Sequence, residues 1–170
     1  LYTTLGPSGE FDGNSGYLVE GSNFSNQVIA NTFSPNQTAT FTNAMLALGN
    51  FEGGNSPVSV FLETDAGGMP GSIIDTLTQQ GTITPFPPGS LINFTTTTSP
   101  LLVAGTSYWL VAQETDPNTG QEWNFAFGDS QNNVAFNQIG SATGPWNRVY
   151  GPQDGFDIFG STGTPGVPEP

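Results

Sequence analysis

The chain has 170 residues, of which 35% are hydrophobic and 9% charged, and this is enough apolar material for one packed domain. Fourteen acidic residues stand against a single base, Arg148, so the formal net charge is −13, which excludes electrostatic attraction to DNA, RNA or an anionic bilayer. His, Cys and Lys are absent, which excludes Ser-His and Cys-His nucleophile pairs, imidazole and thiolate metal sites and Schiff-base chemistry.

Short runs of alternating apolar and polar residues recur along the chain, and Gly, Pro, Asn and Asp separate them. This pattern is typical of half-buried antiparallel strands, and no segment has the period of a helix. We expect strands over residues 16–20, 27–33, 38–48, 57–64, 73–79, 91–97, 107–114, 122–128, 134–138, 147–150 and 156–160. They predict an all-β fold: a two-sheet antiparallel β-sandwich, jelly-roll-like, with extended N- and C-terminal segments.

In two of these strands, the distribution of apolar residues between the two faces predicts where the strand lies. Both faces of 107–114 are apolar, which predicts a central strand. In 122–128, Trp123, Phe125 and Phe127 share one face, and we expect that face to belong to the core.

Two segments are less apolar than these strands. The Thr-rich run 93–99 predicts an exposed edge strand, because threonine favours the pleated conformation. Residues 161–170 have too few apolar groups for a core strand and predict an extended tail. We therefore expect a β-sandwich domain over 1–160, in which 1–14 is a docking or donated segment, followed by that tail.

The tail ends in Val167-Pro168-Glu169-Pro170, which resembles the start of the bacterial PEP-CTERM sorting signal. In that family a hydrophobic helix and a basic cluster follow the Pro-Glu-Pro motif, and an exosortase removes them during export. The body of the chain is similar to the choice-of-anchor R type of extracellular domain. The segments that carry this similarity are Leu5-Gly6-Pro7, Gly16-Tyr17, Ala30-Asn31-Thr32-Phe33, Ala47-Leu48-Gly49, 64–71 and 105–110.

The resemblance implies a β-rich domain exported from a Gram-negative bacterium, at the cell surface or in the extracellular matrix. It implies removal of a signal peptide and of the C-terminal sorting signal, and Leu1 in place of Met agrees with a removed leader. No catalytic residues are associated with that family. No stretch approaches the roughly 18 apolar residues that a bilayer span needs, so we expect no membrane span in the mature chain.

Two kinds of ligand site are candidates. Trp146, Tyr150 and Arg148 lie close together in sequence, and we consider them a site where aromatic rings stack on sugars and Arg148 donates hydrogen bonds. The alternative for Trp146 is a ring that caps one end of the sandwich, and for Arg148 a pairing with a carboxylate.

The second kind of site is for a structural Ca²⁺ ion. Its candidate ligands are oxygen-bearing side chains in two acidic clusters, one in 116–122 and one around Gly155. They are Asp116, Asn118, Glu122, Asp154 and Asp157. The spacing departs from the EF-hand pattern, and the alternative is a plain turn, since the same residues are standard turn formers.

The function that we expect is non-catalytic. The composition allows glycoside hydrolysis by paired carboxylates. However, the chain has few charged side chains and a single base that could orient a substrate. We expect a structural subunit that self-assembles into a homo-oligomer or homopolymer, an extracellular filament or biofilm matrix, through Leu1, Tyr2, Leu5 and Val167. The alternative is a carbohydrate-binding module for extracellular polysaccharide.

Overall fold

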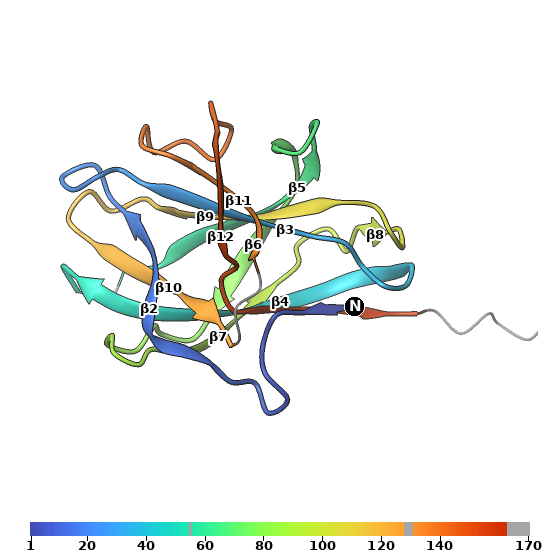
Figure 1. Ribbon diagram of the computed structural model, residues 1–170, viewed down its shortest axis with the longest axis horizontal. Helices are drawn as coiled ribbons and strands as arrows, with labels where there is room; N and C mark the ends of the chain where they lie inside the picture. The colour runs from blue at the N-terminus through green and yellow to red at the C-terminus, as the bar shows by residue number, and fades with distance from the viewer. Residues whose placement is uncertain (55, 128–130, 163–170) are drawn as a thin grey trace, which may run out of the picture.

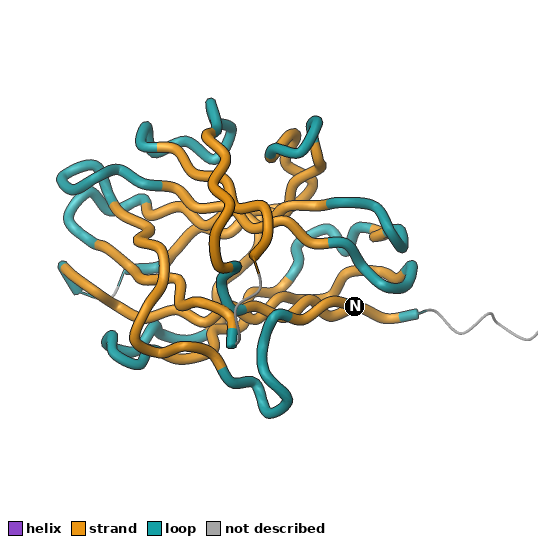
Figure 2. Tube along the Cα trace, in the orientation of Figure 1, coloured by secondary structure: helices purple, strands orange, loops and turns teal. Residues whose placement is uncertain are grey.

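The computed structural model describes residues 1–54, 56–127 and 131–162, and these residues form strands, turns and loops without a helix (Figure 1, Figure 2). The strands are β1 (Tyr2–Thr3), β2 (Phe11–Glu20), β3 (Val28–Phe33), β4 (Ala39–Glu52), β5 (Val58–Asp65), β6 (Pro70–Gln80), β7 (Ser90–Thr95), β8 (Leu101–Leu102), β9 (Tyr108–Glu114), β10 (Gly120–Ala126), β11 (Gln131–Asn137), β12 (Asn147–Pro152) and β13 (Phe156–Ser161). The all-β fold and every predicted strand are confirmed. The pattern missed only β1 and β8, which are too short to show a period.

The strands form one antiparallel sheet that curls into two layers, a β-sandwich-like architecture (Figure 1). In the first layer β1 pairs with β13, β13 with β4, and β4 with β7, β8 and β10, while β2 pairs with β10. The second layer has the order β5-β9-β3-β11-β12. The long strand β6 pairs with β5 and with β7 and so joins the layers.

The buried apolar residues form two clusters. The main core lies between the two layers and contains the fully buried rings of Phe33, Phe41, Phe94, Trp123 and Phe156. A smaller cluster lies on the outer face of the second layer, because alternate residues of its strands point away from the main core. Its buried members are Val28, Ala30, Trp109, Val111, Ala135 and Ala142. The central, two-sided character predicted for 107–114 is therefore confirmed in β9.

The predicted faces of β10 are partly wrong. Trp123 is in the main core, but Phe127 lies beyond the end of the strand and is 61% exposed. Glu122 and Asn124, on the opposite face, are buried. The alternation rule assumes that one face meets water, whereas residues on both faces of β10 are buried.

The predicted edge strand in the Thr-rich run is also wrong. The first part of the run forms β7, which lies between β4 and β6. The second part, Thr96–Thr98, forms a turn held by the buried carboxylate of Asp75. Threonine suits a turn as well as a strand because its hydroxyl bonds to nearby polar groups.

Candidate functional site

The N-terminal segment closes one edge of the first layer. Tyr2 and Thr3 pair with Ile158 and Asp157 of β13. The N-terminal ammonium of Leu1 donates to the Ile158 carbonyl at 2.8 Å. The sequence predicts a segment that docks onto a neighbouring copy or is donated to it, but in the structure the segment pairs with β13 of its own chain.

The ring of Tyr2 anchors the segment from the inside. Its centroid lies 5.8 Å from that of Phe33 and 5.6 Å from that of Phe156, and its hydroxyl donates to Gln153 Oε1 at 3.1 Å. Such aromatic contacts add to the area that the ring buries. Leu5 is buried as well. The first five residues therefore belong to the packing of their own domain.

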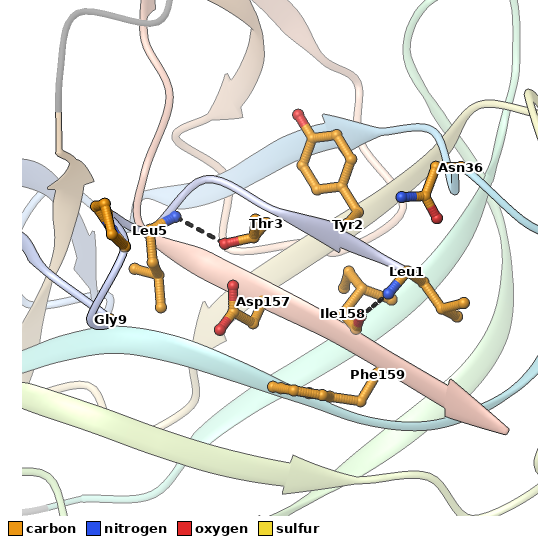
Figure 3. Close-up of a pocket in the computed structure, with 11 residues that line it drawn as sticks. Leu1, Tyr2, Thr3, Leu5, Gly9, Asn36, Asp157, Ile158 and Phe159 are labelled. Carbon is orange, nitrogen blue, oxygen red and sulfur yellow. Dashed lines mark hydrogen bonds between the residues drawn. The ribbon is translucent and has the colours of Figure 1, made fainter.

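A hollow of about 430 Å³ lies beside this strand pair (Figure 3). Tyr2 and Ile158 face the core, and Leu1 also packs against it, whereas Thr3, Asp157 and Phe159 belong to the other face of the strand pair and line the hollow. Phe159 is 38% exposed, and the Oδ1 atom of Asp157 is buried with no hydrogen-bond partner among the described residues. The hollow thus combines apolar side chains with one carboxylate.

The edge of β13 is only half covered. On one side β4 pairs with β13 from Phe156 to Ser161. On the other side the N-terminal segment covers only the first half of β13: β1 pairs with Asp157 and Ile158, and the Thr4 backbone N–H donates to the Phe156 carbonyl. From Phe159 to Ser161 no strand of the described part of the chain pairs with that second side. An uncovered strand edge is a template for pairing with another chain. Leu1, Tyr2 and Leu5 were predicted from the sequence as assembly residues. The place of Asp157 and Phe159 beside them could not be predicted, because the pairing joins opposite ends of the chain.

The candidate sugar-binding residues are neighbours at β12, near the other end of the sheet. Tyr150 is 74% exposed, while Trp146 is partly buried against the outer cluster. Arg148 donates to the Gly68 carbonyl and to the Tyr150 hydroxyl, and its carbon Cζ lies 5.9 Å from the Tyr150 ring centroid. Arg148 thus holds the loop between β5 and β6 near β12.

The candidate calcium ligands are spread over three places. Asp116 and Asn118 lie in the turn between β9 and β10, where Asp116 Oδ1 accepts the Asn118 backbone N–H at 2.9 Å. Asp157 lies on β13, between β1 and β4. The described residues contain no group of three or more His, Cys, Asp or Glu arranged to hold a metal ion.

Glu122 and Asp154 are the two candidate ligands that influence each other. Both are buried, and burial raises the pKa of both carboxyls, with the charge of Asp12 adding to the rise at Glu122 and that of Glu122 adding at Asp154. Asp154 Oδ2 accepts from Asn31 Nδ2 at 2.7 Å. The sequence prediction gave these acids as calcium ligands, and in the structure Asp154 is part of the packing between the layers.

Comparisons with protein-family models, with curated proteins and with solved structures found no match. Among the described residues there is no helix with the length and apolar character that crossing a bilayer requires. Val167, Pro168, Glu169 and Pro170, which carry the predicted sorting motif and part of the predicted assembly segment, lie outside the described residues.

Proposed function

We propose that this chain is a non-catalytic structural domain that assembles with copies of itself through the edge formed by β1 and β13. The half-covered edge of β13, beside a hollow lined by Leu1, Asp157 and Phe159, is the observation that carries the proposal. Main-chain groups of an open edge bind another strand with little demand on its sequence. The apolar side chains of the hollow add contact area to such a pairing.

A second copy has a suitable strand to offer. The pairing order of the curled sheet begins at β1 and ends at β12, and β12 pairs only with β11 among the described strands. When β12 of one copy joins the β1–β13 edge of the next, the contact is head-to-tail. A head-to-tail contact that does not close into a ring generates a filament.

Charge sets the conditions for this assembly. Copies with a net charge of −13 repel one another at low ionic strength. Salt shortens the Debye length from about 30 Å at 0.01 M to about 3 Å at 1 M and so removes the repulsion. Assembly should therefore strengthen with NaCl, and with Ca²⁺ at lower concentration.

The test compares two substitutions of the same kind. Phe159→Glu places a charge in the hollow, and Phe24→Glu places one at a turn after β2; both rings are 38% exposed. Sedimentation velocity and negative-stain electron microscopy should show salt-dependent polymers of the unaltered protein and of Phe24→Glu. Phe159→Glu should stay monomeric, with an unchanged circular dichroism spectrum.

Two results would overturn the proposal. One is a monomer at every ionic strength and at high protein concentration. The other is polymerisation of Phe159→Glu equal to that of Phe24→Glu, because the edge would then play no part.

We also infer export to the surface or matrix of a Gram-negative bacterium. The resemblance of Val167-Pro168-Glu169-Pro170 to a sorting signal supports this, and a chain without His, Cys or Lys suits a structural role outside the cell. Antibody against the domain should label the matrix fraction of the source bacterium. Label confined to the cytoplasm would contradict the inference.

A further inference from the structure

A second hollow, of about 520 Å³, lies where β2 begins and β10 ends. Phe125 pairs with Asp12 and Ala126 with Phe11, while the register jumps between Asn124 and Phe125. Such irregularities bend a strand and redirect its side chains, and they recur next to binding sites. The volume is within the range of about 300–1,000 Å³ that is usual for small-molecule sites.

The apolar lining of this hollow includes three phenylalanines, together with Ala126 and Pro152. Phe11 and Phe125 are partly exposed, and Phe127, just beyond β10, is 61% exposed. An exposed ring at the rim of a hollow offers a flat apolar face to a ligand. The ligand that fits such a face has a flat apolar side of its own.

The polar part consists of hydrogen-bond acceptors and an amide. Asp12 and Asn14 line the hollow, and Asp12 Oδ1 accepts the Asn14 backbone N–H at 3.0 Å. No cationic side chain is among the described residues that line it, and Arg148, the single base of the chain, is not one of them. A ligand rich in hydroxyl donors suits these groups, and an anionic ligand would be repelled.

We propose that this hollow binds a neutral sugar unit of a polysaccharide. The C–H face of a pyranose ring lies on Phe127, and its hydroxyl groups donate to Asp12 and bond to Asn14. Asp12 is the one carboxylate among the described lining residues, and Glu122, whose charge interacts with it, is buried and does not line the hollow. The described lining residues therefore lack the pair of carboxylates that glycoside hydrolysis uses, and the role we propose for the site is sugar binding without catalysis.

The test is affinity electrophoresis of the full chain in gels that contain dextran, galactomannan or mixed-linkage β-glucan, with alginate as the anionic comparison. We expect at least one neutral polysaccharide to retard the protein and alginate not to. Phe127→Ala should weaken the interaction about tenfold, which corresponds to about 1.4 kcal/mol. Asp12→Asn, which keeps the shape of the side chain, should also weaken it.

The controls separate this site from the others. Tyr150→Ala removes the 74% exposed ring on β12 and should leave retardation unchanged. Phe159→Glu should leave it unchanged too, because this inference does not depend on assembly. Failure of all three neutral polysaccharides to retard the protein overturns the proposal, as does equal retardation of Phe127→Ala and the unaltered chain, with thermal melts showing that the variant is folded.

Discussion

At the scale of single residues, the most unusual group is the carboxyl of Glu63 on β5. Its side chain is 0% exposed, and neither oxygen has a hydrogen-bond partner among the described residues. Burial raises its pKa from 4.5 to about 8, because the charged form has lost its hydration. The side chain is therefore mostly protonated at neutral pH.

This pKa predicts a pH dependence of stability. In the unfolded chain Glu63 releases its proton near pH 4.5, and in the folded chain near pH 8. Between these values the folded state holds more protons, so the free energy of unfolding falls as pH rises and levels off above pH 8. A shift of this size is worth at most roughly 5 kcal/mol.

Urea unfolding at pH 5 and pH 8.5 measures the effect. Glu63→Gln cannot ionise and should lose much of the fall that the unaltered protein shows. Glu52→Gln, at an exposed position, is the matched control and should keep it. The same fall in Glu63→Gln as in Glu52→Gln would show that Glu63 is not held in its neutral form.

At the scale of elements, Asp75 joins β6 to the turn that follows β7. The hydroxyls of Thr96 and Thr97 donate to its carboxylate, as do the backbone N–H groups of Thr97 and Thr98, at 3.1 and 3.3 Å. Burial would raise the pKa of Asp75, but these hydrogen bonds outweigh it and lower the pKa. The carboxylate therefore stabilises the fold above its unfolded pKa, and this contribution is lost as pH falls through the lower, folded value.

Substitutions in this turn should lower the free energy of unfolding by different amounts, depending on whether the altered side chain takes part in a hydrogen bond to the Asp75 carboxylate. Asp75→Asn should lower the free energy of unfolding at pH 7 by about 1–3 kcal/mol, as expected for hydrogen bonds to a charged group. Thr97→Ala should cost about 1 kcal/mol, since its hydroxyl donates to Asp75. Thr98→Ala removes a side chain that makes no hydrogen bond to Asp75 among the described contacts, and urea unfolding should show little change. Equal effects of the two threonine substitutions would contradict this assignment.

At the scale of the whole molecule, the net charge of −13 is the feature that should most affect the stability of the folded protein. The fourteen acidic side chains, which face a single base, repel one another more in the compact state than in the unfolded chain. Salt screens this repulsion, so the folded protein should become more stable as ionic strength rises.

Thermal unfolding measures this effect and tests the calcium prediction together with it. From about 0.01 M to about 0.15 M NaCl we expect Tm to rise, by about 2–4 °C for each kcal/mol gained. CaCl₂ at equal ionic strength should give the same rise if calcium only screens, and a larger rise if Asp116, Asn118, Glu122, Asp154 or Asp157 binds it. A Tm that does not respond to NaCl would contradict the prediction.

The sequence by itself determined the class of fold, because period-two alternation and Gly- and Pro-rich turns act within a few residues of each other. It also determined the net charge and the absence of His, Cys and Lys, which need no structure. Only the tertiary structure decided that Tyr2 packs beside Phe156, that β1 leaves half of β13 open, and that Phe127 faces water. These contacts depend on how a sheet closes between residues more than 100 positions apart, and local patterns carry no information about that closure.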